Sequence, residues 1–249
     1  MARTLILPRP TLPVPPHSDA TELLDAPGAI PAPTLAHNLR DIRRVNRFAG
    51  GTAVVLRHLP ELLGDVSRGT TVTLLDIATG SGDIPRALVR WGRRRGYDLR
   101  VLATDISEDV LAVARRETAN EPSIVVEACD ARALPYRDGA FDVAVCSLAL
   151  HHFPRADAVA VLAEMGRVAR RGIILNDLVR TWPGYVGAWL LGNATTRNPL
   201  TRHDAPLSIL RAFTPDELAA MAREAGLTSI EVTPHLFWRM ALVARRSAW

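Results

Sequence analysis

The chain has 249 residues, 48% of them hydrophobic, which predicts one domain with a single large core. All 30 basic residues are arginine, and the absence of lysine excludes a Schiff-base lysine, a Gly-Lys-Ser/Thr phosphate loop and a Tyr-x-x-x-Lys pair. The net charge is only +4 and the arginines are scattered along the chain, so the composition favours a solvated surface and argues against a nucleic-acid partner.

No apolar run approaches the ~18 residues of a membrane-spanning helix, and Leu5-Ile6-Leu7 is too short for the core of a signal peptide. We therefore expect a cytoplasmic protein without a membrane span. Cys129 and Cys146 have neither metal-ligand nor redox spacing, which predicts free thiols, and no metal site is expected.

Proline dominates the first part of the chain. Residues 1–34 hold eight of the 18 prolines and no apolar periodicity, which predicts an extended N-terminal arm. The arm is either disordered or crosses onto a partner subunit, and the second case would place a homodimer contact there. Residues 35–249 are expected to form a single domain. It begins with two helices within residues 35–64, an amphipathic one over 35–48 and a second over 52–63.

The rest of the chain is organised around a strand, a glycine turn and a helix start. The short apolar run over 72–77 lacks helical periodicity and predicts a strand buried on both faces. Gly80 and Gly82 allow positive φ, and Asp83 is expected to cap a helix that continues to Gly96. Such a unit is the usual cradle for a nucleotide-like ligand in an open α/β sheet.

The glycine spacing does not fit the dinucleotide fingerprint, because Pro85 occupies the place of the third glycine. The stretch resembles motif I of the class I S-adenosylmethionine-dependent methyltransferases: Asp76, Gly80 and Gly82 match, and Ala78 stands where the family usually has its first glycine. The resemblance implies a Rossmann-like α/β fold, with a seven-stranded, mostly parallel sheet, helices on both faces, an antiparallel last strand and helical lid insertions. It also implies S-adenosyl-L-methionine as the methyl donor and S-adenosyl-L-homocysteine as the product.

An acid ends the second predicted strand, which covers 99–105. Asp105 lies 23 residues after Gly82, a spacing at which it can bond the ribose hydroxyls of an adenosine. The resemblance assigns it this role; the alternative is a helix-capping aspartate. After a third strand over 123–129, the resemblance implies that Asp130 receives the adenine amino group and that the next backbone N–H meets a ring nitrogen. The implied cofactor-binding residues are Asp76, Ala78, Gly80, Gly82, Asp105, Ile106, Asp130, Ala131 and Ser147.

Two histidines follow the fourth predicted strand, which covers 143–148. The carboxyl end of that strand should face the sulfonium methyl, so His151 or His152 is placed to take a proton from an acceptor hydroxyl. The alternative is that they only cap or pack.

The fifth predicted strand also ends in an acid. A helix over 156–169, terminated by Gly172, precedes this short strand over 173–175. The acid after it orients a histidine, holds an acceptor hydroxyl or caps the next segment. The catalytic candidates are therefore His151, His152 and Asp177.

Residues 181–212 depart from the core plan and predict a lid at the ligand end of the sheet. They contain an aromatic-rich helix and, in the loop expected beyond it, His203. The alternative is a plain core helix. We expect the acceptor between this lid and the end of the first helix, which makes the candidate substrate residues Asn46, Arg47, Phe48, Trp182, Trp189 and His203.

The last part of the chain opens with the near-ideal helix start Thr214-Pro215-Asp216-Glu217, and Gly226 ends that helix. Two strands over 227–233 and 237–244 follow, on either side of Pro234. The resemblance makes them the antiparallel pair that closes the sheet.

The outline of residues 35–249, as a methyltransferase domain, most resembles the small-molecule branch that includes quinone-biosynthesis and natural-product enzymes. We expect methyl transfer to a hydroxylated aromatic or polyketide-like molecule, with O-methylation favoured. The alternatives are a C-methyltransferase of quinone biosynthesis, then an RNA methyltransferase, then a non-catalytic cofactor-binding protein. Nucleic-acid methyltransferases often carry Asn/Asp-Pro-Pro-Tyr/Phe after the fourth strand, where this chain has Leu150-His151-His152-Phe153.

Overall fold

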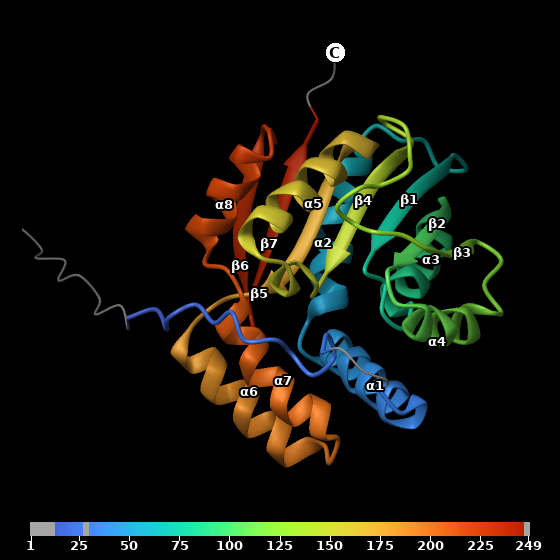
Figure 1. The fold of residues 1–249 in the computed structure, drawn as a ribbon. Coiled ribbons are helices and arrows are strands. Elements are labelled where there is room, and N and C mark those ends of the chain that lie inside the picture. Colours follow the sequence, from blue (N-terminus) through green and yellow to red (C-terminus); the bar gives the residue numbers. More distant parts are fainter. Residues whose placement is uncertain (1–12, 27–29, 247–249) are drawn as a thin grey trace, which may run out of the picture.

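The computed structural model describes residues 13–26 and 30–246, which form one sheet with helices around it (Figure 1). The sheet has the strand order β3-β2-β1-β4-β5-β7-β6. The strands are β1 (Thr71–Ile77), β2 (Asp98–Asp105), β3 (Ile124–Ala128), β4 (Phe141–Ser147), β5 (Ala169–Leu178), β6 (Ile230–His235) and β7 (Arg239–Arg245). The helices are α1 (Ala32–Phe48), α2 (Gly51–Leu63), α3 (Asp83–Arg95), α4 (Glu108–Thr118), α5 (Arg155–Val168), α6 (Trp182–Thr195), α7 (Pro199–Arg211), α8 (Pro215–Glu224) and the short 3₁₀ turn η1 (Leu150–His152).

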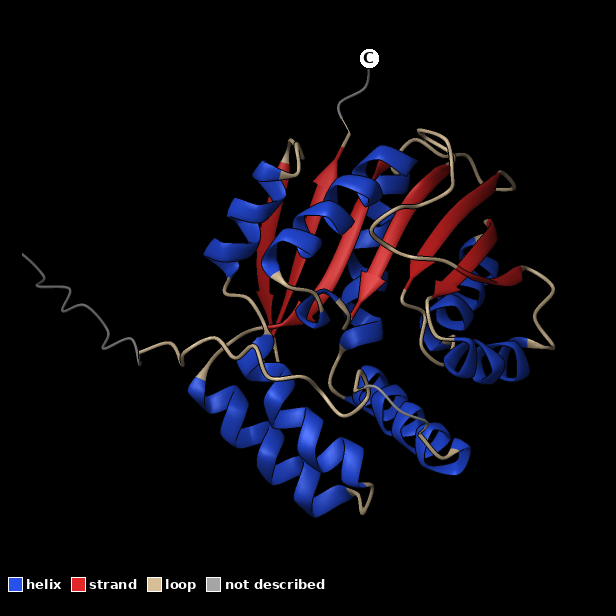
Figure 2. Ribbon diagram, in the orientation of Figure 1, coloured by secondary structure: helices blue, strands red, loops and turns tan. Residues whose placement is uncertain are grey.

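The strand directions confirm the fold class that the sequence predicts. β1 is parallel to β2 and β4, β2 to β3, and β4 to β5, whereas β7 is antiparallel to both β5 and β6. The parallel strands therefore end at one common edge, and β7 begins at that edge (Figure 2). We call it the carboxyl edge.

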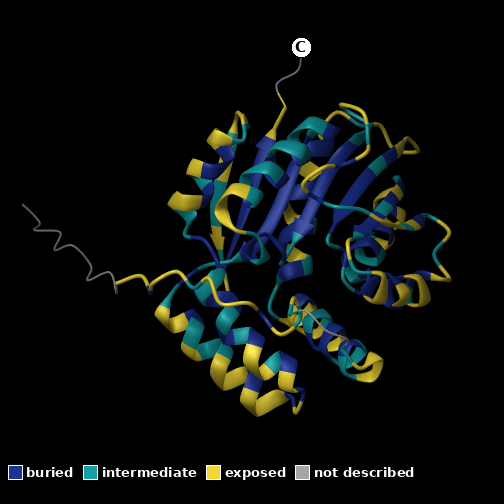
Figure 3. Ribbon diagram, in the orientation of Figure 1, coloured by how far each residue is buried: buried dark blue, intermediate teal, exposed yellow. Residues whose placement is uncertain are grey.

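Both faces of the sheet are covered, which is why its strands are continuous apolar runs. On one face Leu175 and Met240 belong to a cluster with residues of α5 and α8. On the other, Leu74, Ile174 and Val243 pack with residues of α2 and α3. Figure 3 shows the buried strands between helices whose outer faces are exposed.

Some boundaries differ from the prediction: α1 begins at Ala32, inside the arm predicted over 1–34, and β5 is longer than the predicted 173–175. Two further differences have a clear physical cause. α5 ends at Val168 and β5 begins at once, so Gly172 lies inside the strand and does not end the helix. A Cβ at Gly172 would stand 2.3 Å from the carbonyl oxygen of Ala244, so the close approach of β5 and β7 needs glycine there. Pro234 lies within β6 and not between two strands, which is tolerated because β6 is an edge strand.

Helices α1, α6 and α7 lie beyond the carboxyl edge (Figure 1), and α7 contacts α1, α6 and η1. The segment over 181–212 is thus a pair of helices, and its role as a lid stays a prediction. His203 lies on α7 and not in a loop. A second helix starts there because Pro199 occupies its first position and the Asn198 side chain accepts a hydrogen bond from the backbone N–H of Leu200.

Residues 13–26 of the proline-rich arm lie against the same chain. The Ser18 N–H donates to the Leu210 carbonyl (3.1 Å), the Leu23 N–H donates to Asp204 (2.8 Å), and Arg180 donates to the Pro15 carbonyl (2.7 Å). Residues 1–12 and 27–29 of the predicted arm lie outside the described residues. A homodimer contact through the arm stays a prediction.

Over residues 13–26 and 30–246, no helix is both long enough and apolar enough to cross a membrane. Cys146 is buried, Cys129 is half-buried, and both are free, as their spacing predicts. Burial raises the pKa of both thiols, which keeps them protonated and weakly nucleophilic.

Candidate functional site

The turn after β1 holds three residues with positive φ. Gly80 and Gly82 have φ values of 56° and 70°, and a Cβ at Gly82 would stand 2.7 Å from Cγ2 of Thr118, which makes glycine necessary there. Ala78 has a φ of 54°, a conformation that costs a residue with a side chain about 1–2 kcal/mol. The chain therefore keeps the turn without the glycine that usually begins it.

Asp105 ties the end of β2 to this turn. Its carboxylate accepts hydrogen bonds from the backbone N–H groups of Gly80 (3.2 Å) and Ser107 (3.1 Å). Burial raises the pKa of Asp105, and these hydrogen bonds only partly offset it. Ser107, and not Asp105, is the N-cap of α4. Ile106 is 68% exposed, so an apolar surface and a carboxylate lie next to each other, an arrangement suited to a base and its ribose.

Two more acids flank the glycine turn, Asp76 in β1 and Asp83 at the start of α3. Burial, together with the charges of Asp83 and Asp105, raises the pKa of Asp76 to about 8. Burial also raises the pKa of Asp83, and the hydrogen bond that Asn46 Nδ2 donates to it (3.1 Å) lowers the pKa by a smaller amount. The prediction that Asp83 caps α3 is wrong: Gly82 is the N-cap, and Asp83 is the first helical residue, where its charge favours the helix dipole. Burial favours the neutral form of all three acids, and a bound cation would favour their charged form.

Asp130 and Ala131 follow β3. The carboxylate of Asp130 accepts hydrogen bonds from Arg132, whose Nη2, Nε and backbone N–H lie 2.8, 3.0 and 2.9 Å away. These bonds hold the pKa of Asp130 below its usual value, so it stays an ionised acceptor. Ala131 is buried.

The α2-facing side of the sheet carries two polar residues at the carboxyl edge. Asn176 Nδ2 donates to Ser147 Oγ (2.7 Å), and Asn176 Oδ1 has no hydrogen-bond partner in the described part of the chain. Sequence reasoning selected Ser147 and the neighbouring Asp177 but missed Asn176. The alternation of β5 is the signal, because it places Asn176 and Asp177 on opposite faces.

His151 and Asp177 form a buried pair at the ends of β4 and β5. His151 Nδ1 lies 2.6 Å from Oδ1 of Asp177, and Oδ2 accepts the backbone N–H of His151 (3.1 Å). Burial raises the pKa of Asp177, but His151 lowers it more, so this carboxylate stays ionised. The ionised carboxylate accepts a hydrogen bond from Nδ1–H. In the neutral ring, Nε2 of His151 is therefore left with a lone pair that can take a proton.

His152 is bound to the arm: its Nδ1 lies 2.6 Å from Oδ2 of Asp25. Burial lowers the pKa of His152, but the hydrogen bond to Asp25 and the charges of Glu22, Asp25 and Asp177 raise it to about 9. His152 is therefore protonated at neutral pH and is a poor proton acceptor. Of the two histidines, His151 suits a base.

Glu22 and Arg211, which sequence reasoning missed, complete this region. Oε1 of the buried Glu22 lies 3.8 Å from Nε2 of His151 and accepts a hydrogen bond from Ser208 on α7 (2.9 Å). Arg211 donates to the carbonyl oxygens of His151 (3.1 Å) and His152 (2.8 Å). No pattern in the proline-rich arm marks Glu22, because only its packing against α7 brings it here.

Glu22, His151 and His152 are also the one group of potential metal ligands among the described residues, with ligand atoms within 4.8 Å of one another. A histidine must be neutral to bind a metal, so an ion in this group would have to displace the proton that the neighbouring acids favour on His152.

The predicted substrate residues do not all gather at this pair. Asn46 is buried and bonds to Asp83, so it lies beside the glycine turn. The guanidinium of Arg47 lies over the ring of Phe48, which is 72% exposed.

The remaining three lie on the helix pair. Trp182 and Trp189 on α6 are 40% and 50% exposed, and the exposed His203 on α7 pairs with Asp204 (2.8 Å). A substrate role for these residues stays a prediction.

Arg239, at the start of β7, is a further residue that sequence reasoning missed. It is 1% exposed, and its Nε donates to the carbonyl oxygen of Ala49 (2.9 Å). Burial lowers the pKa of Arg239 to about 10, while Asp177 and Asp83 raise it, so it is charged at neutral pH. Its signal is a single charge in the otherwise apolar run over 237–244.

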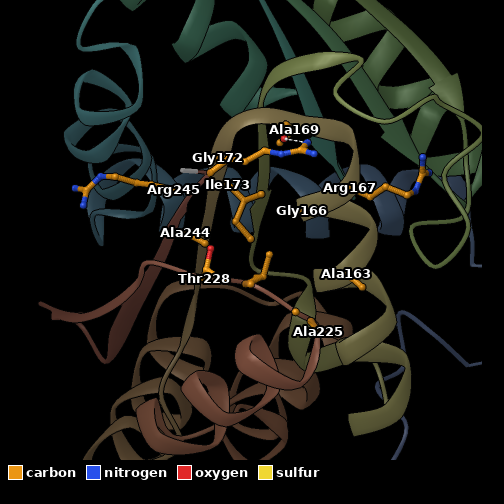
Figure 4. A pocket seen from close by; sticks show the side chains of 13 residues that line it. Ala163, Gly166, Arg167, Ala169, Gly172, Ile173, Ala225, Thr228, Ala244 and Arg245 are labelled. Atoms are coloured by element: carbon orange, nitrogen blue, oxygen red, sulfur yellow. Dashed lines mark hydrogen bonds between the residues drawn. The ribbon is translucent and has the colours of Figure 1, made fainter. Parts of the chain in front are cut away.

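A hollow of about 510 Å³ lies at the opposite edge of the sheet (Figure 4). It is lined by parts of α5, β5 and β7, among them Gly166, Ile173 and Ala244. Figure 4 shows Arg167 and Arg245 pointing away from it. Ligands in open α/β sheets bind at the carboxyl ends of the parallel strands, so this hollow is not the candidate site.

The sheet order, the glycine turn and the acid that ends β2 define a Rossmann-like protein that holds an adenosine-containing ligand at the carboxyl edge. Beside that place stands a histidine–aspartate pair that can accept a proton. Fold and site together describe an enzyme that transfers a group from such a ligand.

Comparisons of sequence and structure show that the chain is similar to known methyltransferases. The methyltransferase domain family matches residues 74–172. The ubiquinone/menaquinone biosynthesis C-methyltransferase UbiE of Burkholderia vietnamiensis is 30% identical over 173 residues, which cover 64% of this chain and 68% of that protein. The demethylmenaquinone methyltransferase of Thermotoga maritima is 28% identical over 171 residues, covering 61% and 69%. Human N-acetylserotonin methyltransferase, solved with S-adenosylmethionine, has a TM-score of 0.63 at 14% identity, covering 88% of this chain and 57% of that one, and shows the shared fold.

The chain belongs to the class I S-adenosylmethionine-dependent methyltransferases, and S-adenosylmethionine is its methyl donor. The residues present fit this donor. It carries a sulfonium and an ammonium, and the three neighbouring acids Asp76, Asp83 and Asp105 have pKa values that a bound cation would lower.

Proposed function

We propose that this methyltransferase O-methylates a hydroxylated aromatic or polyketide-like small molecule. The observation that carries the proposal is the buried pair of His151 and Asp177, 2.6 Å apart at the ends of β4 and β5. A base in that place is what an acceptor hydroxyl needs, because the neutral hydroxyl is a weak nucleophile.

On the donor side, Asp105 bonds the ribose hydroxyls, and Asp130 and the Ala131 N–H bond the adenine. Ile106 supports this arrangement, because its exposed side chain can lie against the base. Fixing the donor in this way contributes to the rate by aligning it with the acceptor, an effect that reaches roughly 7–11 kcal/mol in well-oriented reactions.

On the acceptor side, Nε2 of His151 takes the hydroxyl proton as the oxygen attacks the methyl carbon. The donor supplies an electrophilic methyl group, and its sulfur leaves as a neutral thioether. Asp177 holds the ring with Nδ1 protonated and stabilises the imidazolium that forms. Arg211 fixes the backbone of both histidines through their carbonyl oxygens.

A second candidate is C-methylation of a quinol-like ring. The named activity of the Burkholderia relative favours it. The same base serves it, because removing the hydroxyl proton makes the ring carbons next to the hydroxyl carbon nucleophilic.

The test is methyl transfer from donor labelled with carbon-13 in the methyl group, offered with a panel of hydroxylated aromatics, polyketide-like phenols and reduced quinones. Nuclear magnetic resonance of the product then separates a methyl ether from a ring methyl. We expect methyl ethers that His151→Ala abolishes. Ring methylation alone would replace the first candidate by the second, and no transfer to any member would refute both.

A further inference from the structure

The junction of α1, α2 and β7 holds buried polar groups that no residue in the described part of the chain satisfies. Both Nη1 and Nη2 of Arg239 lack a hydrogen-bond partner among the described residues, although the side chain is only 1% exposed. Oδ1 of the buried Asn46 lacks one as well. Native proteins pair such groups, so a buried cation and a buried acceptor without partners point to a ligand.

These groups lie close together at the start of α2. A Cβ placed on Gly51 would stand 2.4 Å from Oδ1 of Asn46 and 3.0 Å from Nη1 of Arg239. Gly51 is the first residue of α2, and the preceding Gly50 offers no side chain to cap it. The guanidinium therefore lies beside a helix N-terminus, and both attract an anion.

The same groups are connected to the glycine turn. Nδ2 of Asn46 donates to Asp83 (3.1 Å), and the Ser81 hydroxyl donates to the same carboxylate (3.4 Å). Acceptors for a cation and donors for an anion thus stand next to each other, on one side of the glycine turn. An α-amino acid carries an ammonium group, which such acceptors bind, and a carboxylate, which such donors bind. The methyl donor ends in an α-amino acid.

We propose that Arg239, with the N-terminus of α2, binds the α-carboxylate of the methyl donor, and that Asn46 and Asp83 bind its α-ammonium group. Arg239 is then a donor-binding residue contributed by the antiparallel strand, far in sequence from the glycine turn. The inference concerns the donor alone and does not depend on which acceptor is methylated.

The test compares two ligands by calorimetric titration: S-adenosylhomocysteine, and 5′-methylthioadenosine, which lacks the amino-acid end. The variants are Arg239→Met and Asn46→Leu. The matched control is Arg245→Met, at the other end of β7, where the arginine pairs with Glu61 on the surface. Arg239→Met should fold, because it replaces a buried unpaired charge by an apolar side chain of similar length.

We expect Arg239→Met to weaken S-adenosylhomocysteine about 10- to 100-fold, the size expected for a lost charge-assisted pair, and to change 5′-methylthioadenosine less than about twofold. Asn46→Leu should also lower the affinity for S-adenosylhomocysteine more than the affinity for 5′-methylthioadenosine. This second variant keeps the test decisive if Arg239→Met does not fold.

Three results would overturn the proposal. An equal loss of affinity for both ligands would show that Arg239 maintains the structure of the pocket and does not bind the carboxylate. Unchanged affinity for both ligands would show that the Arg239 guanidinium does not contact the donor. Failure of the wild-type protein to bind either ligand would remove the donor site itself, an outcome distinct from a failed acceptor screen.

Discussion

The donor side and the acceptor side of the site are built in different ways. The residues proposed to bind the adenosine part of the donor, from Asp76 to Ala131, lie in one stretch of chain, at the ends of β1, β2 and β3. The proposed acceptor side joins Glu22, His151 and Arg211 with Asp177 of β5, so it draws on the arm, η1 and α7 as well. Recognition of the adenosine part of the donor is thus expected from successive βα units. The proposed acceptor chemistry, like the proposed contact of Arg239 with the donor carboxylate, depends on packing between distant segments.

The sharpest way to separate the two sides is His151→Ala. It should lower kcat by about 10²- to 10⁴-fold, because the general base is lost, and leave the Kd for S-adenosylhomocysteine unchanged. Steady-state kinetics and calorimetry measure the two quantities. His152→Gln is the control and should retain most of the activity, because His152 is already protonated. If His151→Ala lowered the affinity for S-adenosylhomocysteine as much as it lowers kcat, the donor and acceptor sides would not be separate.

The converse test is Asp105→Ala. It should raise the Kd for S-adenosylhomocysteine by about 10- to 100-fold, because the ribose loses charge-assisted hydrogen bonds and the Gly80 N–H loses its partner. Asp98→Ala, at the other end of β2, is the control and should bind normally. Calorimetric titration gives both values, and equal affinities would remove Asp105 from the donor site.

A smaller effect is expected from pH on the donor side. The pKa of Asp76 is about 8 in the free protein, so at pH 7 it is mostly protonated. A bound cation favours the ionised form, so binding should release a proton below pH 8. Affinity should then rise by up to about tenfold per pH unit as pH increases toward 8. Calorimetry in two buffers of different ionisation enthalpy measures the release. Asp76→Asn should release fewer protons on binding, and its affinity should change less with pH. An unchanged pH dependence in this variant would point to Asp83 or Asp105.

The smallest effect concerns the arm on the acceptor side. The folded-state pKa of His152, about 9, exceeds its ordinary value of 6.5. Its pairing with Asp25 therefore stabilises the arm fully below pH 6.5, and this contribution is lost as pH rises through 9. Asp25 is partly exposed and screened, so the loss is on the order of 1 kcal/mol.

Hydrogen exchange of residues 13–26 measures this attachment. Exchange, corrected for its intrinsic pH dependence, should increase several-fold between pH 6.5 and 9.5 in the wild type. It should be independent of pH in His152→Gln. Equal protection at both pH values in the wild type would show that the ion pair does not hold the arm.

The same contrast explains what the sequence could predict. The turn at Gly80 and Gly82 and the cap at Thr214 follow from local rules, and the structure has both. The mostly parallel sheet is implied by the family resemblance, and the strand directions confirm it. The boundary at Gly172 differs because a strand pairing decides it. The helix through His203 begins with a local cap at Asn198, a signal that sequence reasoning overlooked. Turn chemistry acts within a few residues, so a sequence displays it directly.

Glu22 and Arg239 illustrate the other kind of residue. Each reaches its place only after the chain packs, Glu22 through Ser208 on α7 and Arg239 through the α1–α2 junction. Neither spacing nor periodicity encodes such a contact. A charged residue in an apolar strand gives a clue for Arg239, whereas an acid in a proline-rich arm gives none.

The bonds of Arg211 also bear on the order in which the protein becomes competent as it folds. Arg211 joins the histidine carbonyls to the carbonyl of Ala20, 191 residues earlier in the chain. Contacts so distant in sequence close slowly, because the intervening chain must first lose its freedom. The βα units proposed to bind the adenosine part of the donor need no such closure. We therefore expect the adenosine-binding part of the site to form during folding before His151 and His152 reach their final positions.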